Sequence, residues 1–311
     1  MKGLLYSKSA KDKLIYCDIK KPIPNDNELL IRINAVSVNA LDYRLCKMGR
    51  APKKKIFGAD ISGVVESVGM NVHTFQVGDE VIGDISDFGL GGFAEYTTAP
   101  EKAFVLKPAN LSFEEASALP IAGITALQAL CDKGNIQRGQ KILIVGSGGG
   151  VGTFAVQLAK YFGSIVTGVC SSKNVEQTKR LGADKVIDYS KEDFGMEIGA
   201  YDLILAINGN YPLSAYKRCL KQNGKCVFVG GALSQVFKTL FFGKLMFLGS
   251  KKMCNLFAKS NQKDLEYITK LAKDSKIRAV VEKVYSLENT AEAMRYAANG
   301  HASGKVVIKN D

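Results

Sequence analysis

The sequence contains only two histidines, His73 and His301. Catalytic zinc sites in proteins are built mainly from histidine, cysteine and carboxylate ligands. A site of histidine and cysteine is hard to assemble from so few histidines, and His73 lies in a turn-like segment where it is most simply a surface residue. We therefore predict no metal ligands in this chain.

Closely spaced cysteine pairs are also lacking. The seven cysteines are scattered, and none forms a C-x-x-C motif; they stand at positions 17, 46, 131, 170, 219, 226 and 254. An odd, unpatterned set is typical of reduced thiols in a reducing compartment. The first residues lack an apolar core followed by small residues, so no secretory leader is expected. Together these features favour a cytoplasmic protein.

Long apolar runs are absent as well. The most apolar stretch, residues 236–258, is interrupted by Lys238 and Lys244, so it falls short of the roughly 20 apolar residues that span a membrane. We interpret it as a loop that lines a cleft, followed by an edge strand near 244–250 that could pair with a second subunit. The alternative is a peripheral membrane contact, because basic and aromatic residues mix there.

The charge is unbalanced, with a formal net charge of +12. Lysines are spread along the chain, with small clusters at 53–55 and 251–252 and no long run of like charge. A lysine-rich solvated surface explains this pattern. Attraction of an anionic cofactor, of RNA or of an anionic membrane surface are the alternatives.

Residues 141–160 carry the most informative pattern in the chain. A buried strand, a glycine-rich turn and an apolar helix follow one another there. Glycines let the chain turn tightly and let a ligand approach the backbone. The first turn of the following helix offers free N–H groups and the positive end of its dipole to a pyrophosphate. The sequence therefore predicts a dinucleotide-binding unit.

The next strand, within residues 164–174, indicates which dinucleotide is bound. An NAD-selective site usually ends this strand with a carboxylate that holds the ribose 2′-hydroxyl. Here the end reads Cys170, Ser171, Ser172, Lys173, Asn174, with no carboxylate. Hydroxyl groups and an ammonium suit a 2′-phosphate, so NADPH is predicted.

The chain divides into two patterns. Up to about residue 110, short strands alternate with glycine turns, as in a partly closed β-barrel. Ser112 and Glu115 then have the spacing of a capping box, and Pro120 interrupts the helix that they begin. From about residue 140, strands alternate with helices, which predicts a doubly wound parallel sheet of the α/β class. The expected strands of that sheet are 141–146, 164–170, 184–189, 201–207 and 224–231.

Several segments along the whole chain resemble the zinc-independent quinone oxidoreductase branch of the medium-chain dehydrogenase/reductase superfamily. The resembling segments are 34–44, 57–83, 91–100, 118–130, 146–160, 181–189 and 300–308. The resemblance implies a GroES-like β-barrel domain from residues 1–118 and 275–311, and a Rossmann domain from 119–274. It further implies an active site in the cleft between the domains, and a homodimer joined through an edge strand.

The resemblance also implies cofactor contacts at individual residues. They fall in the pyrophosphate turn, the 2′-phosphate region, the strand end beside the nicotinamide, and the last segment of the chain. The residues are Ser147, Gly149, Gly150, Val151 and Gly152; Ser171, Lys173, Asn174 and Tyr189; Gly230, Gly231 and Ala232; and Lys305. Asn208 stands near where relatives often have a Thr-Val pair.

Zinc-dependent relatives place a cysteine where this chain has Asn39, and a His-Glu pair where it has Ala59 and Asp60. Without a metal, oxidation of an alcohol needs a strong local base, and no persuasive relay is present. Hydride addition to an enone, enal or quinone needs only hydrogen-bond donors and a proton. The candidate donors are Asn39, Tyr43 and Thr125, with Tyr43 a plausible packing residue instead.

Two other functions stay open at this point. The chain could bind NADPH structurally and have RNA or a membrane surface as its main partner. It could also be an alcohol dehydrogenase that recruits zinc through other ligands. The sequence does not name the acceptor, and it does not separate one-electron from two-electron reduction.

Overall fold

In a computed structural model, the structure describes residues 1–10, 12–209, 211–231 and 249–310. The chain folds as two compact units, one of residues 1–121 with 260–311 and the other of residues 122–259. The C-terminal segment therefore returns to the unit that the N-terminal segment begins. This grouping places helix α9 (Gln262–Lys273) in the first unit, whereas the sequence analysis placed it in the dinucleotide domain.

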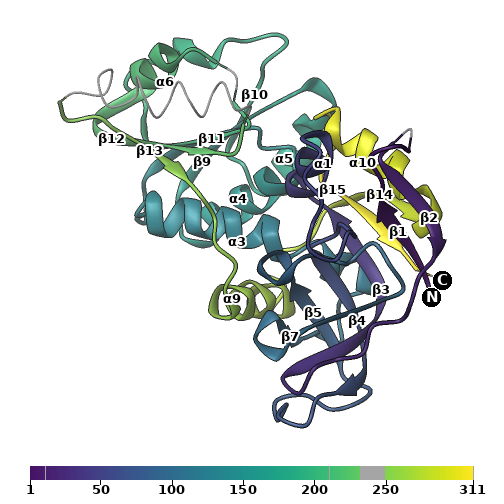
Figure 1. Cartoon of the computed structure of the whole chain (residues 1–311). Coiled ribbons are helices and arrows are strands. Elements are labelled where there is room, and N and C mark those ends of the chain that lie inside the picture. The colour runs from purple at the N-terminus through teal and green to yellow at the C-terminus, as the bar shows by residue number, and fades with distance from the viewer. Residues whose placement is uncertain (11, 210, 232–248, 311) are drawn as a thin grey trace. The chain divides into compact units, whose positions relative to one another are not determined.

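Among the described residues, the second unit is built on a six-stranded sheet in the order β10-β9-β8-β11-β12-β13. Figure 1 labels its strands β9 to β13. All the pairings in it are parallel. Its strands are β8 (Lys141–Val145), β9 (Ile165–Cys170), β10 (Lys185–Asp188), β11 (Tyr201–Ile207), β12 (Leu220–Val229) and β13 (Lys252–Leu256). The strand order reverses between β8 and β11, and ligands of such sheets bind at the carboxyl ends of the strands at this point. The predicted doubly wound sheet is confirmed.

Helices connect these strands and cover the sheet. They are α3 (Pro120–Gln128), α4 (Gly150–Tyr161), α5 (Val175–Arg180) and α6 (Leu213–Cys219), with a π-helical turn at Ala129–Lys133. Helix α4 packs on β8 and β9, and α5 packs on β9 and β10. The chain passes from one unit to the other within α3, which begins at Pro120. The predicted interruption at Pro120 is confirmed, because α2 ends at Ser117 and proline, which has no N–H to donate, fits the first turn of a new helix.

Two boundaries in the second unit differ from the expectation. Strand β12 begins at Leu220 rather than near residue 224, because Leu220 follows directly from α6 and pairs with Tyr201. Among the described strands, β13, which begins at Lys252, lies at the edge of the sheet opposite β10. Residues 249–250 of the expected strand near 244–250 form a bend, and residues 244–248 lie outside the described part of the chain.

In the part of the first unit that the structure describes, a seven-stranded sheet has the order β14-β15-β3-β4-β5-β7, with β6 also paired to β3. A separate hairpin of β1 and β2 completes its strands. The strands are β1 (Lys2–Tyr6), β2 (Leu14–Asp18), β3 (Glu28–Val38), β4 (Asp60–Val68), β5 (Glu80–Asp84), β6 (Tyr96–Pro100), β7 (Phe104–Leu106), β14 (Val281–Ser286) and β15 (Lys305–Lys309). Only β14 and β15 pair in parallel, and β15 pairs antiparallel with β3.

Helices α1 (Ala40–Lys47), α2 (Phe113–Ser117), α9 and α10 (Thr290–Ala298) complete the first unit. The predicted capping box at α2 is confirmed, since the Ser112 side chain accepts from the Glu115 N–H and Glu115 accepts from the Ser112 N–H. The core of this unit is continuous, with Phe57, Phe93 and Phe104 fully buried. A rigid core of this kind fixes the ends of β3, β4 and β15, where the polar cluster described below lies.

Candidate active site and dinucleotide-binding turn

The glycine-rich turn joins β8 to α4 in the second unit, as predicted. Gly146 has φ +86°, and a Cβ there would lie 2.6 Å from the carbonyl oxygen of Ile207. A Cβ on Gly152 would lie 2.0 Å from the carbonyl oxygen of Gly146, so the helix can approach the strand only through a glycine. Gly149 is the N-cap of α4, and a Cβ there would have its nearest neighbour at 3.8 Å. The turn is therefore packed on one side and open at Gly149.

Ser147 is fully buried within this turn. Its hydroxyl donates to the carbonyl oxygen of Val169 at 3.2 Å and lies 3.4 Å from the Thr178 hydroxyl. The Ser147 side chain thus fastens the turn to β9 and α5. The Ser147 backbone N–H also donates to the carbonyl oxygen of Val169, at 3.1 Å. The side chain therefore points into the protein, which explains why the tight turn accepts a serine.

Asn174 lies behind the turn, where a Cβ on Gly148 would come within 2.5 Å of its amide nitrogen. The Nδ2 group of Asn174 donates to the Ser171 hydroxyl at 3.3 Å. Its Oδ1 is buried and has no hydrogen-bond partner among the described residues. A buried acceptor without a partner is costly, and a ribose hydroxyl would supply the missing donor. This orphaned acceptor, together with the open N-terminus of α4, fits a bound dinucleotide.

The structure places a carboxylate beside this region that the sequence rule did not find. Asp188 ends β10 and is the register partner of Cys170 at the end of β9. It accepts hydrogen bonds from the Ser172 hydroxyl at 2.6 Å, the Ser190 hydroxyl at 2.7 Å and the Ser190 N–H at 3.0 Å. These bonds, led by that of Ser172, lower the pKa of Asp188 to about 2. The position of Asp188 at the end of the next predicted strand could have indicated this, because parallel pairing puts the ends of adjacent strands together.

The other predicted cofactor residues of the second unit lie at strand ends. Tyr189 follows β10 and is about half exposed. Gly230 and Gly231 follow β12 with φ of 65° and 109°, and the Gly231 N–H donates to the Asn208 side chain at 3.0 Å. Asn208 thus ties the ends of β11 and β12 together. Ala232 lies outside the described residues.

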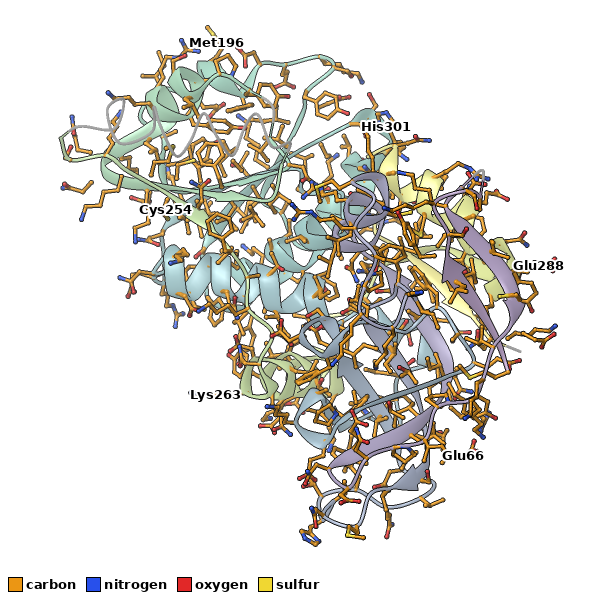
Figure 2. The ribbon with its side chains drawn as sticks, in the orientation of Figure 1. Glu66, Met196, Cys254, Lys263, Glu288 and His301 are labelled. Atoms are coloured by element: carbon orange, nitrogen blue, oxygen red, sulfur yellow. The ribbon has the colours of Figure 1, made fainter. Side chains whose placement is uncertain are left out.

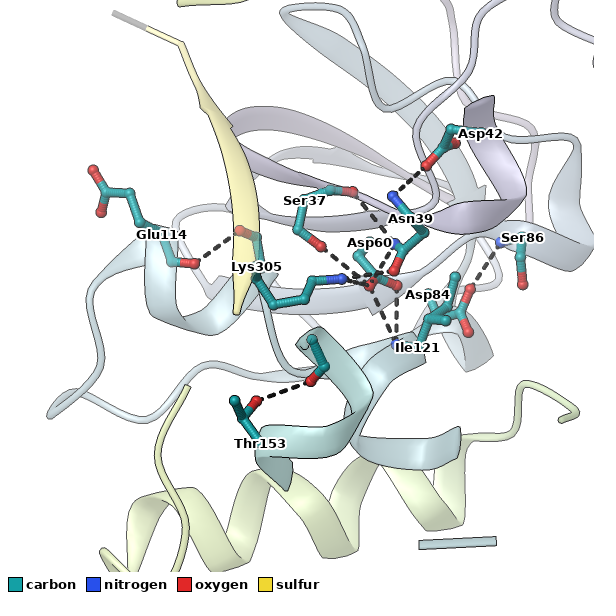
Figure 3. Close-up of polar contacts among 12 residues, drawn as sticks. Ser37, Asn39, Asp42, Asp60, Asp84, Ser86, Glu114, Ile121, Thr153 and Lys305 are labelled. Atoms are coloured by element: carbon teal, nitrogen blue, oxygen red, sulfur yellow. Dashed lines mark hydrogen bonds and ion pairs between the residues drawn. The ribbon is translucent and has the colours of Figure 1, made fainter. Parts of the chain in front are cut away.

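In the first unit, Asn39 stands at the centre of a buried polar cluster (Figure 3). It precedes α1 and is 7% exposed. Its Nδ2 group donates to the Oδ2 of Asp60 at 2.8 Å and to the carbonyl oxygen of Ser37 at 3.3 Å. Its Oδ1 accepts from the ammonium of Lys305 at 2.6 Å. The structure therefore brings together two predicted site residues, Asn39 and Lys305, that are far apart in the sequence.

Asp60 is the carboxylate of this cluster and is fully buried at the start of β4. Besides Asn39, it accepts from the Ser37 hydroxyl at 3.2 Å and from the Ile121 N–H at 3.1 and 3.2 Å. Its Oδ2 lies 3.6 Å from the Lys305 ammonium. Burial raises the pKa of Asp60 to about 7, against the opposing effect of Lys305. The sequence identified Asp60 only as one of the two residues that stand where zinc-dependent relatives have a His-Glu pair. The contacts of Asp60 were not predicted.

Two further carboxylates are buried near this pair. Asp42, in the first turn of α1, accepts from the Asn39 N–H at 2.8 Å and the Gly58 N–H at 2.9 Å, and burial raises its pKa to about 6. Asp84 is the cross-strand neighbour of Asp60 and accepts from the Ser86 N–H at 2.9 Å. Burial also raises the pKa of Asp84 and lowers the pKa of Lys305. One ammonium is thus surrounded by three buried acids.

The two other predicted donors are not part of this cluster. Tyr43 lies in α1, where its half-buried ring packs against the hydrophobic core of the first unit. Thr125 lies in the part of α3 that belongs to the second unit and is 8% exposed. Of these three candidate donors, only Asn39 is hydrogen-bonded to charged side chains among the described residues, namely those of Asp60 and Lys305.

Within the described ranges, no group of three or more His, Cys, Asp and Glu side chains is placed to hold a metal ion. His301 lies on the segment between α10 and β15 (Figure 2). No helix in the described part of the chain is long and apolar enough to cross a membrane.

Comparison with known proteins agrees with this geometry. Residues 25–109 match the alcohol dehydrogenase GroES-like domain family, and residues 181–308 match the family described as zinc-binding dehydrogenase. The chain is 35% identical to the chloroplastic quinone-oxidoreductase QR1 of Triphysaria versicolor, over 95% of this chain and 94% of that protein. It is 32% identical to the 2-methylene-furan-3-one reductase of Solanum lycopersicum, over 99% and 79%. The solved quinone oxidoreductase of Coxiella burnetii superposes with a TM-score of 0.87 at 30% identity, over 99% of both chains.

The fold and the dinucleotide turn define a nicotinamide-dependent oxidoreductase of the medium-chain dehydrogenase/reductase superfamily. Within that superfamily the chain belongs to the quinone oxidoreductase family. The predicted combination of a GroES-like domain with a Rossmann domain is thereby confirmed.

Proposed function

We propose that this protein is an NADPH-dependent reductase that transfers hydride to a quinone or to an α,β-unsaturated carbonyl compound. The observation that carries the proposal is the match over nearly the whole chain to relatives named for these two acceptor types, a quinone and a methylene-furanone. The furanone named there is itself a conjugated ketone. One mechanism serves both acceptors, because each accepts hydride and ends as an oxygen anion that needs a proton.

The second unit supplies the residues that would hold the cofactor. The pyrophosphate would bind at the backbone of Gly149, Gly150, Val151 and Gly152, at the N-terminus of α4. The Asn174 Oδ1 would accept from a ribose hydroxyl, and Gly230 and Gly231 would lie beside the nicotinamide. When bound, the reduced nicotinamide supplies the hydride; the protein orients the acceptor, excludes water and provides the proton.

The phosphate preference rests on Ser171 and Lys173. The Ser171 hydroxyl oxygen already accepts from Asn174, so its own proton is left to donate to a phosphate. Lys173 adds a positive charge on the exposed turn after β9. Asp188 opposes this preference with a negative charge, which three hydrogen bonds and Lys191 at 3.7 Å partly offset. We infer a preference for NADPH that Asp188 moderates.

The acid–base groups of the first unit favour reduction of a conjugated acceptor. Oxidation of an alcohol needs a base or a metal at the hydroxyl. The buried cluster of Asn39, Asp60 and Lys305 holds a proton on an ammonium instead, which suits delivery of a proton to a product oxygen. Metal analysis of the purified protein tests this reading, and stoichiometric zinc that is required for turnover would contradict it.

Cofactor oxidation with a small panel of acceptors tests the proposed function. We expect the purified protein to oxidise NADPH in the presence of a small enone or an ortho-quinone, with kcat/KM at least several-fold higher for NADPH than for NADH. The preferred acceptor then separates quinone reduction from enone reduction. Dinucleotide binding without turnover on either acceptor would overturn the proposal, and a preference for NADH would overturn the assignment of Ser171 and Lys173.

We further propose a homodimer joined through the edge of the parallel sheet in the second unit. Strand β13 forms that edge among the described strands, and an edge strand can extend its sheet by pairing with a strand of another copy. Light scattering during size-exclusion chromatography tests the dimer, and a monomer at all concentrations would contradict it. None of the seven cysteines, including Cys254 on β13 (Figure 2), forms a disulfide in the described part of the chain. This supports a reducing compartment, and we propose the cytoplasm.

A further inference from the structure

The hydrogen-bond inventory of Asn39 leaves it no donor for a substrate. An amide side chain has two N–H bonds. In Asn39 they point to Asp60 and to the Ser37 carbonyl oxygen. Its oxygen faces the Lys305 ammonium, which can only donate. Asn39 therefore connects the other polar groups and cannot itself protonate a product.

Lys305 has the donor that Asn39 lacks. An ammonium has three N–H bonds. One goes to the Asn39 Oδ1 at 2.6 Å, and a second points toward the Asp60 Oδ2 at 3.6 Å. No third acceptor for this ammonium lies within hydrogen-bonding distance among the residues that the structure describes. The cluster thus ends in one N–H bond that is free to meet a ligand.

Burial and the neighbouring charges determine how readily the Lys305 ammonium releases this proton. The side chain is 4% exposed. It faces carboxyl groups from three elements: Asp60 of β4, Asp42 of α1 and Asp84 of β5, which in turn has Asp87 nearby. Burial lowers the pKa of Lys305, and these carboxylates act in the opposite direction. An ordinary surface lysine holds its proton too tightly to act as an acid at neutral pH.

We propose that Lys305 is the catalytic acid of the reductase, with its free N–H directed at the oxygen of the acceptor. This inference rests on the proposed function. As hydride adds to the conjugated carbon, electrons move to the carbonyl oxygen. An N–H bond of Lys305 breaks, an O–H bond forms, and the product is an enol or a hydroquinone. The neutral amine then takes one proton from water.

Asn39 and Asp60 are positioning residues in this scheme. The amide of Asn39 holds the Lys305 ammonium through its oxygen and Asp60 through its nitrogen, so it fixes the distance between the charges. Asp60 is itself anchored by the Ile121 N–H in the first turn of α3 and by the Ser37 hydroxyl. The arrangement spans β3, β4 and β15, so the lysine has a defined direction (Figure 3).

Substitution Lys305→Met tests the proposal. Loss of a general acid should lower kcat by about 10²-fold or more with the preferred acceptor. NADPH affinity, measured by quenching of protein or cofactor fluorescence, should stay within about twofold, because the role lies in proton delivery. Lys309→Met is the matched control, since Lys309 is on the same strand but exposed and paired with Glu114, and its kcat should equal that of the wild type.

The pH profile separates an acid from a structural lysine. Because the ammonium form is the active one, wild-type kcat should fall as pH rises through the pKa of the coupled Lys305 and Asp60 pair. Lys305→Arg keeps the charge but holds its proton up to a pKa above about 12, so it should turn over slowly, with no fall in that range. Asp60→Asn should shift the fall, because it removes one of the facing charges.

Lys305→Met leaves Asp60 buried without its counter-charge, which can unfold the chain. The double variant Lys305→Met with Asp60→Asn removes both charges and should fold while remaining slow. Wild-type turnover in either variant would overturn the proposal. So would a loss of NADPH affinity that accounts for the lost activity, since Lys305 would then be a cofactor contact. A wild-type protein that reduces neither acceptor would overturn the proposed function and this inference with it.

Discussion

Asp188 shows at the residue scale how a neighbouring strand changes the interpretation of a cofactor site. The end of β9 carries serines and a lysine and no carboxylate, and this pattern predicts NADPH. The register of β9 and β10 brings the Asp188 carboxylate to the same place, hydrogen-bonded to Ser172. A carboxylate repels a 2′-phosphate, so this residue should limit selectivity for NADPH.

We predict that Asp188→Asn raises the NADPH preference. The asparagine oxygen can still accept from Ser190, and its NH2 group can donate to the Ser172 hydroxyl, but the substitution removes a full negative charge near the proposed 2′-phosphate position. The ratio of kcat/KM for NADPH to that for NADH should rise about tenfold, equivalent to about 1.4 kcal/mol. Steady-state kinetics with both cofactors measure the ratio. Asp184→Asn on the preceding exposed turn is the control, and an equal rise there would point to a general charge effect.

The buried acids of the first unit illustrate what one sequence cannot provide. Asn39 was a candidate from its sequence position, whereas its lack of free donors depends on Asp60 and the Ser37 carbonyl oxygen. Its oxygen accepts from Lys305, which lies at the other end of the chain. Asp60 and Asp84 face one another only because β4 and β5 pair in one register. Side-chain partners across strands follow from tertiary packing, which local patterns do not encode.

At the element scale, the turn between β8 and α4 makes two separate demands on its glycines. Gly152 is required for packing, because any Cβ would strike the carbonyl oxygen of Gly146. Gly149 has open space beside it and a φ of −86° that any residue adopts. Its requirement for glycine should therefore come from the ligand alone.

We predict opposite outcomes for alanine at these two positions. Gly149→Ala should keep the wild-type Tm but weaken NADPH binding about tenfold or more, because the methyl group occupies the approach of the pyrophosphate. Gly152→Ala should lower Tm strongly, since backbone has to move. Thermal unfolding and cofactor titration measure both effects. An unaltered NADPH affinity in Gly149→Ala would contradict the assignment of this turn.

Elements with strong local patterns were predictable from the sequence. The strands of the parallel sheet, the capping box at Ser112 and the helix interruption at Pro120 all depend on neighbours in the chain. The start of β12 at Leu220 was not predictable, because the pairing with Tyr201 extends the strand beyond its apolar run. Residues 244–248 of the expected edge strand lie outside the described part of the chain, so that prediction stays open. The pairing of β13 with β12 was not predicted, because apolar composition does not specify which segment pairs with which.

At the scale of the whole molecule, the charge of +12 favours anionic ligands in general. A dinucleotide with an added phosphate is one of them, and RNA or an anionic lipid surface are others. Family membership and the turn at the N-terminus of α4 favour the first. The two units have different proposed roles. Cofactor binding is assigned to the parallel sheet, and proton delivery is assigned to the buried cluster around Lys305.

A deuterium label tests the proposed hydride transfer to a conjugated acceptor most directly. NADPH deuterated at C4 of the nicotinamide, on the face that is transferred, is mixed with the protein and a small enone, and the saturated ketone is analysed by mass spectrometry and NMR. We predict one deuterium per product molecule, on the β-carbon, with the other added hydrogen coming from solvent. A product without the label on that carbon, or oxidation of NADPH with no saturated ketone, would contradict hydride transfer to a conjugated acceptor.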